Sequence, residues 1–310
     1  MDTKLKIVFM GTPDFAAASL EALVKNGADI VGVITAPDKP KGRGKKLGTS
    51  AVKETALANS LRILQPTNLK DEGFIEELRS LEADLQIVVA FRMLPVIVWD
   101  MPRLGSFNLH ASLLPAYRGA APINWAIING EKETGITTFF LKHEIDTGSI
   151  LFQEAEKINP TDSVGEVYTR LMNKGASLTV KTLKAIESGQ YTETPQSNSE
   201  DLKHAPKIFK EDCQINWNQP SNQVFNFIRG LSPYPAAWTT MHEKQIKLFK
   251  TELVSQKLPV GSFRSDGKTF MHIGTLDGAL SILELQLEGK RKITIDEMLR
   301  GYQWPSKKTI

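Results

Sequence analysis

The hydrophobic positions in the first half of the chain form short runs separated by amphipathic stretches. Four of these runs, each rich in Val, Ile or Phe, occupy residues 5–10, 29–34, 85–90 and 105–110. Runs that are apolar at successive positions are typical of strands buried on both faces of a parallel sheet. Apolar residues at helical spacing lie between the runs, near residues 14–26, 51–60 and 71–81. This alternation predicts an α/β fold with a Rossmann-like, doubly wound and mostly parallel sheet.

Two glycine-containing turns are candidates for nucleotide binding, and neither has the required spacing. The turn GTPDF at 11–15 lacks the G-x-G-x-x-G pattern of dinucleotide sites; there, Thr12 is predicted to cap the next helix and Pro13 to start it. The stretch 42–50 lacks the lysine that directly precedes Ser or Thr in an NTP-binding loop. The pattern therefore argues against both classes of site.

A strand pair and a long helix are predicted next. The strands span 135–141 and 150–155, with Asp146 in the turn between them. Ser163 and Glu166 form a capping box at the start of the helix, and Gly189 is a suitable stop. Residues 190–206 are polar and without periodicity, which is typical of a linker. The sequence thus predicts an N-terminal domain over 1–189 and a linker over 190–206.

The pattern changes after the linker. One helix is predicted over 221–230, and the Asp-Gly pairs at 266–267 and 277–278 stand between strand-like runs, a strong hairpin signal. Residues 282–289 alternate apolar and polar positions, as a half-buried strand does. We therefore predict a smaller C-terminal β-barrel of the OB-like type over 207–310.

Composition agrees with two soluble domains. The 310 residues are 41% hydrophobic, enough for a sizeable core. A single cysteine, Cys213, excludes an intrachain disulfide, and no Cys/His spacing predicts a metal site. The most apolar region, 85–99, is interrupted by Arg92 and Pro95 and is too short to span a bilayer. We expect a cytoplasmic protein with no metal.

Charge is unevenly distributed along the chain. Residues 1–205 hold 23 Lys and Arg against 25 Asp and Glu, whereas residues 206–310 hold 15 against 10. A second basic segment, PDKPKGRGKKLG at 37–48, contains Lys39, Lys41, Arg43, Lys45 and Lys46. The simplest interpretation of this segment is a solvated flexible loop without a specific function. Because the C-terminal part is basic as well, we favour a polyanionic partner such as a nucleic acid.

Asn108 and His110 are the first candidates for chemistry. Residues i and i+2 of a strand share a face, so both side chains point the same way at the C-terminal end of a predicted parallel strand. An amide and an imidazole are two donors that could stabilise an oxyanion, and histidine can donate in either charge state. If N-x-H stood alone, the simpler explanation would be that Asn108 ends the strand and His110 is a hydrogen-bonded histidine of the core. The loop that follows, with Pro115, Arg118 and Gly119, favours a pocket wall.

Asp146, in HEIDTGS, is the third candidate. A turn-forming aspartate is the default interpretation of such a position. The functional interpretation is a carboxylate that accepts a proton and orients the histidine.

Several motifs resemble, in the same order, the formyltransferases that use 10-formyltetrahydrofolate, above all those that act on methionyl-tRNA. They are FMGTPDFA (9–16), PDKPKGRGKKL (37–47), VVAFRMLP (88–95), SFNLHASLLPAYRGAAPI (106–123), EIDTG (144–148) and IRGLSPYPAAW (228–238). The resemblance implies formyl transfer to the α-amine of methionyl initiator tRNA, for translation initiation. It makes Asn108, His110 and Asp146 the catalytic residues.

The resemblance also implies binding residues and a monomer. The folate donor would lie against Val89, Ala90, Phe91, Arg92, Leu94, Ser112, Leu113, Leu114 and Pro115. The tRNA would meet Lys39, Lys41, Arg43, Lys45 and Lys46. Arg92 departs from the family pattern, which has Ala-Tyr-Gly where this chain has Ala-Phe-Arg.

Other functions remain open at this point. A formyltransferase that acts on a small amine, such as glycinamide ribonucleotide or an amino sugar nucleotide, shares the same chemistry. A non-catalytic tRNA-binding protein is an alternative of another class.

Overall fold

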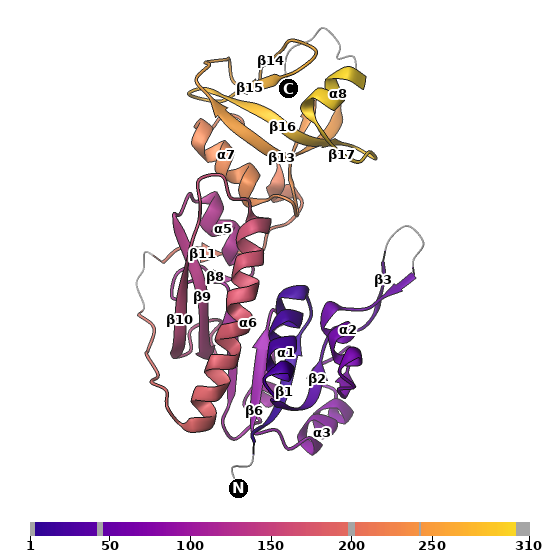
Figure 1. Cartoon of the computed structure of the whole chain (residues 1–310), viewed down its shortest axis with the longest axis vertical. Coiled ribbons are helices and arrows are strands. Elements are labelled where there is room, and N and C mark those ends of the chain that lie inside the picture. The colour runs from indigo at the N-terminus through magenta and orange to yellow at the C-terminus, as the bar shows by residue number, and fades with distance from the viewer. Residues whose placement is uncertain (1–3, 42–45, 198–201, 242, 302–310) are drawn as a thin grey trace. The chain divides into compact units, whose positions relative to one another are not determined.

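The computed structural model describes residues 4–41, 46–197, 202–241 and 243–301 (Figure 1). Residue contacts divide the chain into two units. The first unit comprises Met1–Arg118, Gly135–Glu156 and Thr169–Lys203. The second unit comprises Gly119–Thr134, Lys157–Tyr168 and His204–Ile310. The predicted division at 189 and 207 remains a prediction, and each unit is described by itself.

The first unit is built on a seven-stranded sheet in the order β10-β9-β7-β6-β1-β2-β5. Its strands are β1 (Lys6–Gly11), β2 (Asp29–Ile34), β5 (Ile63–Leu64), β6 (Leu85–Val89), β7 (Ser106–His110), β9 (Glu133–Phe140) and β10 (Ile150–Lys157). Strand β1 pairs in parallel with β2 and β6, as do β2 with β5 and β6 with β7, whereas β7 and β9 are antiparallel. The predicted doubly wound, mostly parallel sheet is confirmed.

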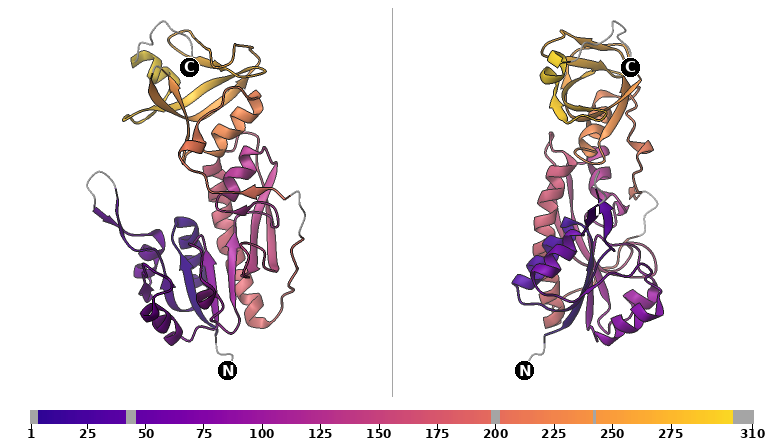
Figure 2. Two further views of the ribbon diagram at one scale, coloured as in Figure 1. Left: turned by 180° about the vertical axis from the view of Figure 1, so that it is seen from behind. Right: turned by 90° about the vertical axis from the view of Figure 1, so that its right-hand side faces the viewer.

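Helices cover both faces of this sheet, as the turned view in Figure 2 shows. They are α1 (Asp14–Lys25), α2 (Ala51–Ala58), α3 (Glu72–Ser80), α4 (Val96–Trp99) and the long α6 (Val164–Ser188). Leu109 of β7 faces α6, because a Cβ added to Gly175 would lie 2.8 Å from its Cδ2 atom. On the opposite face, α3 buries Phe74, Ile75 and Leu78 in one core cluster with residues of β1 and β6. Both faces of the central strands are therefore buried, which explains their unbroken apolar runs.

The second unit contains a six-stranded antiparallel sheet. Its strands are β12 (Ala237–Met241), β13 (Lys244–Val254), β14 (Phe263–Ser265), β15 (Met271–Gly274), β16 (Ala279–Leu287) and β17 (Lys292–Thr294). The order is β12-β13-β16-β15-β14, with β17 beside β16. Both predicted Asp-Gly hairpins are confirmed: β14 pairs with β15, and β15 with β16.

Helices of the second unit close its core. They are α5 (Pro122–Ile128), the 3-10 helix η1 (Glu211–Cys213), α7 (Ser221–Gly230) and α8 (Ile295–Gly301). Val224 and Ile228 of α7 and Met298 of α8 pack on the sheet in one cluster of buried side chains. Two further small sheets pair β3 (Lys39–Lys41) with β4 (Lys46–Gly48), and β8 (Arg118–Gly119) with β11 (His204–Ala205).

The predicted helix ends have mixed outcomes. The capping box is confirmed, since the Ser163 backbone N–H donates to Glu166 and the Glu166 N–H to Ser163. Gly189 follows α6 with a left-handed φ of +66°, as predicted. The prediction for Thr12 was wrong, because Pro13 occupies the N-cap of α1 and no side chain caps the helix.

Candidate active site

Strand β7 presents Asn108 and His110 on one face, at its C-terminal end. In the register of the sheet, Asn108 lies opposite Val88 of β6 and Phe139 of β9, and His110 lies opposite Thr137 of β9. The side chain of Leu109, between the two, is buried against α6 on the other face. The two candidate residues therefore share a face, as the i, i+2 spacing predicts.

The imidazole of His110 is buried and has a different neighbour at each nitrogen. Its Nε2 atom lies 2.9 Å from the carbonyl oxygen of Tyr117. Its Nδ1 atom lies 3.9 Å from Oδ2 of Asp146. Because a carbonyl oxygen only accepts hydrogen bonds, Nε2 must carry a proton in this arrangement. In neutral His110, the atom that faces Asp146 is then a bare nitrogen.

This geometry limits one prediction made from the sequence, that His110 donates to an oxyanion in either charge state. Its Nε2–H already donates to the backbone of Tyr117. Only Nδ1 is left for substrate, and Nδ1 has a proton to donate only when the ring is charged. The neutral ring can therefore act as a base but not as an oxyanion donor.

Asp146 lies in the turn between β9 and β10 and has a left-handed backbone, with φ of +55°. The turn is tight: a Cβ added to Gly148 would lie 1.5 Å from the carbonyl oxygen of Phe140, so glycine is required there. The Asp146 side chain is 11% exposed. The backbone of this turn thus brings a largely buried carboxylate to face the His110 ring.

Asn108 has an unused hydrogen-bonding atom. Its Oδ1 is buried and has no partner among the described residues. A buried amide oxygen is normally hydrogen-bonded, and exceptions concentrate at sites that await a ligand or water. The Asn108 amide therefore has capacity left for a substrate.

The loop after His110 is held by the hydroxyl of Thr137, which is fully buried. This hydroxyl donates to the carbonyl of Ser112 (2.6 Å) and accepts from the N–H of Leu114 (3.2 Å). The amide nitrogen of Gln153 lies 2.8 Å from the Leu114 carbonyl and 3.0 Å from Thr137 Oγ1. The Ser112 hydroxyl donates to the Ala116 carbonyl at 2.7 Å. The loop is thus fixed by the buried Thr137 of β9 and by the exposed Gln153 of β10.

The predicted folate-lining residues differ in accessibility. Val89, Ser112 and Leu114 are buried, so their side chains belong to the interior. Leu113, Pro115, Phe91 and Leu94 are half-buried, and Ala90 is exposed, with φ of +45°. Phe91 and Leu94 pack against the core cluster on the α3 face. That these residues contact folate remains a prediction.

Arg92, the departure from the family pattern, binds protein backbone. Its Nη1 and Nη2 atoms donate to the carbonyl oxygens of Thr67 (2.9 Å) and Pro66 (2.5 Å). The guanidinium also lies 5.6 Å from the ring centre of Phe91. Arg92 therefore links the segment after β6 to the segment before α3.

The basic segment at 37–48 is predicted as a loop, but its two ends are strands. Strands β3 and β4 pair antiparallel, with Lys39 opposite Gly48 and Lys41 opposite Lys46. We call residues 39–48 the basic hairpin. Lys39 is exposed. Arg43 and Lys45 lie outside the described residues.

An ion pair anchors the base of the basic hairpin. Asp38 Oδ2 lies 2.5 Å from Nζ of Lys53 in α2, and Asp38 Oδ1 accepts from Gln65 at 2.9 Å. These hydrogen bonds, with Lys53 first, hold the pKa of Asp38 below its ordinary value. Gln65 also donates to the Ala36 carbonyl at 2.8 Å. The residues that lead into the basic hairpin are therefore fixed to α2 and to Gln65.

Comparison with known proteins identifies the chain. The formyl transferase family model matches residues 5–183, and the model of the formyl transferase C-terminal domain matches residues 207–303. The chain belongs to the formyltransferase family.

Curated relatives match this formyltransferase over nearly its whole length. A methionyl-tRNA formyltransferase of Bacteroides fragilis (strain ATCC 25285) is 54% identical, over 96% of this chain and 95% of the relative. One of Parabacteroides distasonis is 52% identical, over 99% and 98%.

Solved structures share the fold of this formyltransferase at low identity. An N-formyltransferase from Helicobacter canadensis, in complex with folinic acid and dTDP-3-aminofucose, superimposes with a TM-score of 0.68. It is 23% identical and covers 93% of this chain and 100% of that one. HypX from Aquifex aeolicus, in complex with tetrahydrofolic acid, has a TM-score of 0.62 at 19% identity, over 99% and 51%. At these identities only the fold is shared.

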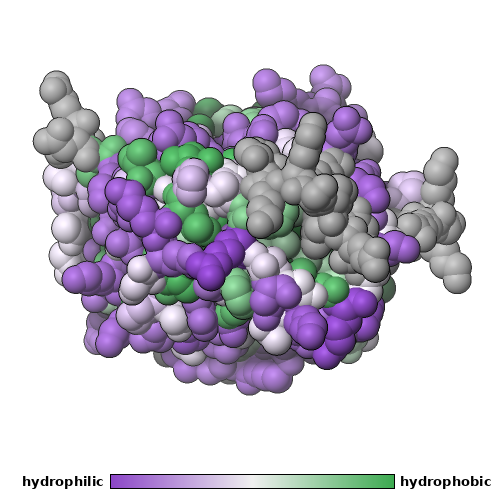
Figure 3. Space-filling model, turned by 90° about the horizontal axis from the view of Figure 1, so that it is seen from above, coloured by the Kyte–Doolittle hydropathy of each residue, from purple (hydrophilic) through white to green (hydrophobic). Residues whose placement is uncertain are grey.

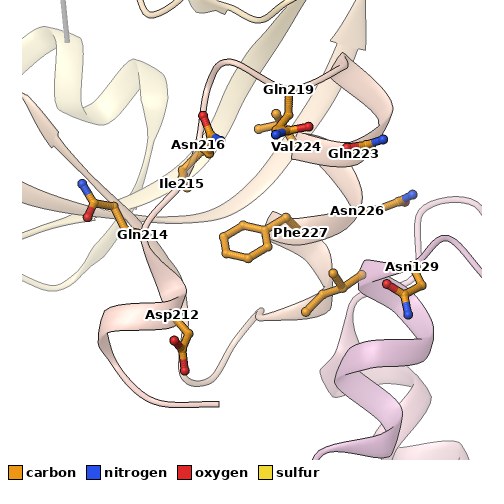
Figure 4. Close-up of a pocket in the computed structure, with 11 residues that line it drawn as sticks. Asn129, Asp212, Gln214, Ile215, Asn216, Gln219, Gln223, Val224, Asn226 and Phe227 are labelled. Carbon is orange, nitrogen blue, oxygen red and sulfur yellow. The ribbon is translucent and has the colours of Figure 1, made fainter. Parts of the chain in front are cut away.

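A cavity of about 440 Å³ in the second unit of the formyltransferase differs in its lining from the site around His110 (Figure 4). It lies between η1, α7 and the end of α5. Its lining is mostly amides and apolar side chains, with Asp212 as the one carboxylate and no Lys, Arg or His among the described lining residues. Asp212 is the one possible base in this lining, and its Oδ2 atom accepts a hydrogen bond from the Phe209 N–H at 2.8 Å.

Three further features of the formyltransferase bear on the kinds of site it carries. One face of the molecule is mostly hydrophilic, with small groups of hydrophobic residues between (Figure 3). Among the residues that the structure describes, no group of three or more His, Cys, Asp and Glu could hold a metal ion. In the same ranges, no helix has the length and apolar character that crossing a bilayer requires.

The sequence pattern missed the residues that support the site. Thr137 and Gln153 are polar positions on β9 and β10 that the strand period does not mark, because β9 is buried at successive positions and Gln153 is exposed. The Tyr117 carbonyl and Gln196 carried no signal, because the first is backbone and the second lies in a polar segment without periodicity.

Proposed function

We propose that this chain transfers the formyl group of 10-formyltetrahydrofolate to the α-amine of methionine esterified to initiator tRNA. The product is formylmethionyl-tRNA for translation initiation. The observation that carries the proposal is the 54% identity to a methionyl-tRNA formyltransferase over 96% of the chain. The match to the C-terminal model at 207–303 supports an acceptor that needs more than the first unit.

The reaction places distinct demands on the three candidate residues. The neutral α-amine attacks the formyl carbon, a C–N bond forms, and the formyl oxygen takes the displaced electron pair. The amine then loses a proton, the bond from the formyl carbon to N10 of folate breaks, and N10 gains a proton. The site must therefore stabilise an oxyanion and remove one proton from the amine.

Asn108 suits the first task. Its side chain ends in an amide whose Oδ1 atom lacks a partner among the described residues. The amide N–H groups donate to the developing oxyanion, while Oδ1 accepts an N–H of the attacking amine. An amide keeps both capacities at any pH in the physiological range.

His110 and Asp146 suit the second task. With its Nε2–H held by the Tyr117 carbonyl, neutral His110 directs the lone pair of Nδ1 toward the side on which Asp146 lies. Nδ1 takes the amine proton, and the carboxylate stabilises the imidazolium that results. The charged ring then has an Nδ1–H that returns the proton to N10. His110 is thus the base and later the acid.

The two substrates are assigned to separate sets of residues. Folate lies against the half-buried or exposed members of the predicted set, namely Ala90, Phe91, Arg92, Leu94, Leu113 and Pro115, with Val89, Ser112 and Leu114 supporting them from inside. The basic hairpin, through Lys39, Lys41, Arg43, Lys45 and Lys46, meets the tRNA backbone. A cytoplasmic location and a monomeric state remain predictions.

A formyl-transfer assay tests the proposal. Methionyl initiator tRNA, glycinamide ribonucleotide and an amino sugar nucleotide are offered in parallel with 10-formyltetrahydrofolate, to the wild-type chain and to His110→Ala. We expect transfer to the tRNA alone, lost in the variant. Transfer to a small amine would replace the acceptor and keep the chemistry. Binding of tRNA with no transfer to any acceptor would overturn the enzymatic function.

A further inference from the structure

The side chain of Gln196 joins the two loops that flank His110. Its Nε2 atom donates to the carbonyl oxygens of Asp146 and Gly148, each at 2.8 Å. Its Oε1 atom accepts from Nη2 (2.6 Å) and Nε (3.1 Å) of Arg118. Arg118 follows Tyr117, whose carbonyl holds the imidazole at Nε2. One amide therefore connects the backbone of Asp146 to the loop that fixes the ring.

The chemistry of these partners requires glutamine. Carbonyl oxygens only accept and a guanidinium only donates, so the amide orientation is fixed by its four hydrogen bonds. The amide uses both N–H donors and both lone pairs of its oxygen. Glutamate would keep the interaction with Arg118 but would set a carboxylate oxygen against two carbonyl oxygens.

The segment that carries Gln196 is itself attached to the sheet. The N–H of Thr194 donates to the Ile150 carbonyl (2.9 Å), and the N–H of Ile150 donates to the Thr194 carbonyl (2.8 Å), at the start of β10. The ring of Tyr191 packs edge-on against Phe140 with centroids 6.0 Å apart. Gln196 is half-buried while its neighbours at 195 and 197 are exposed. The segment predicted as a linker thus presents the Gln196 side chain inward from a backbone that is attached to the sheet.

We propose that Gln196 is a positioning residue of formyl transfer, which holds the Asp146 turn so that its carboxylate faces Nδ1 of His110. The proposal rests on the function proposed above. A left-handed aspartate persists only where its surroundings hold it, and the two bonds from Gln196 act directly on this turn. Gln196 itself touches no reacting atom. Its loss should change the rate of the chemical step rather than the binding of either substrate.

Two substitutions of Gln196 separate the hydrogen bonds of its amide nitrogen from those of its amide oxygen. Gln196→Met has a similar length and removes all four hydrogen bonds, whereas Gln196→Glu keeps the interaction with Arg118. We expect kcat to fall about tenfold or more in both, with KM values for tRNA and folate within about twofold. The Glu variant should be the slower one, because it repels the Asp146 turn. If Met is slow while Glu retains wild-type kcat, the interaction with Arg118 is what matters and the proposal is overturned.

A double-mutant cycle with Asp146→Asn tests whether Gln196 acts through Asp146. In that background, Gln196→Met should reduce the residual rate by less than about twofold, because the carboxylate it positions is gone. A further reduction equal to that seen in the wild-type background would contradict the proposal. Gln190→Glu, an exposed site that makes the same charge change, should leave kcat unchanged.

Hydrogen exchange of the full chain gives a readout that does not depend on activity. Amides of residues 145–149 should exchange faster in Gln196→Met than in the wild type, and at the wild-type rate in Gln190→Glu. Unchanged exchange in Gln196→Met overturns the proposal. If the wild type transfers no formyl group, the proposed function fails on its own, and the exchange result still decides whether Gln196 holds the turn. Gln196→Glu serves the same comparison if the Met variant does not fold.

Discussion

The site around His110 and the basic hairpin are two polar regions of the same unit. They differ in the burial of their polar groups. At His110, a buried ring lies between a backbone carbonyl and a carboxylate, and the loops that supply them are held by Thr137, Gln153 and Gln196. In the basic hairpin, an exposed cation, Lys39, lies in a two-stranded ribbon whose base is anchored through Asp38.

The difference indicates how the two regions contribute to function. A buried, fixed constellation acts on the rate, because small displacements of reacting groups are costly. Exposed cations act on affinity, and their contribution weakens as salt is added. Changes near His110 should therefore affect kcat, and changes in the basic hairpin should affect tRNA binding.

The largest effect is expected for Asp146→Asn. The substitution removes the charge that stabilises the imidazolium, so kcat should fall by about 10²–10⁴-fold, while the dissociation constant for tRNA stays near that of the wild type. Steady-state kinetics with methionyl initiator tRNA and a separate binding titration measure the two. Glu144→Gln makes the same charge change in the same turn at an exposed side chain and is the control. An equal fall of kcat in both variants would assign the effect to turn charge rather than to Asp146.

The next largest effect is expected for Thr137→Val, which should destabilise the fold. It removes the hydroxyl that bonds Ser112, Leu114 and Gln153, and the partners left unpaired should lower the free energy of unfolding by about 1–3 kcal/mol. Urea unfolding measures it. Thr134 of the same strand is the matched control, because its buried hydroxyl has no partner among the described residues and Thr134→Val should be neutral or stabilising. The reverse order would show that the loop does not depend on Thr137.

Neutralising the basic hairpin should weaken tRNA binding by about tenfold at low salt. Replacing Lys41, Arg43 and Lys45 by Gln should also flatten the slope of log affinity against log salt, by about one unit for each phosphate that is no longer neutralised. The rate at saturating tRNA should stay unchanged. The control replaces Lys25, Lys70 and Lys184, which are exposed on helices and turns of the first unit. Weaker folate binding in place of weaker tRNA binding would reassign the hairpin.

The smallest effect is expected for Asp38→Asn. Lys53 and Gln65 hold the pKa of Asp38 below its ordinary value. The ionised carboxylate therefore stabilises the fold at any pH above the ordinary pKa of an aspartate. This contribution disappears as the pH falls through the lowered pKa. The thermal midpoint of the wild type should therefore fall more steeply with acid than that of Asp38→Asn. Parallel curves for the two proteins would show that the anchor carries no stability.

Much of the fold was predictable from the apolar pattern. The central strands and α6, which begins directly after Ser163, have boundaries within a few residues of the prediction, because burial on both faces and a capping box leave direct traces in the sequence. The strands of the basic hairpin were missed, since a ribbon of Lys, Gly and Pro has no alternation of apolar and polar positions. The N-cap of α1 was missed because a threonine before proline suits a cap in sequence whether or not it makes the bond.

The site was predictable in its candidates and not in its geometry. Asn108 and His110 share a face because the strand period fixes it, and the structure brings Asp146 to His110. Which imidazole nitrogen faces the carboxylate depends on the carbonyl of Tyr117, and no side-chain pattern encodes a backbone contact. Gln196 lies 50 residues beyond Asp146 in a polar segment, so only the folded chain brings it to the turn.

The proton on His110 is the most direct test of how the site works. A long-range ¹H–¹⁵N spectrum of the labelled chain at neutral pH, assigned with His110→Ala, distinguishes a protonated from a bare ring nitrogen. We expect Nε2 to carry a proton, with Nδ1 as the position that gains and loses one. A neutral ring protonated at Nδ1 and bare at Nε2 would contradict the hydrogen bond to Tyr117, and with it the role of His110 as the base.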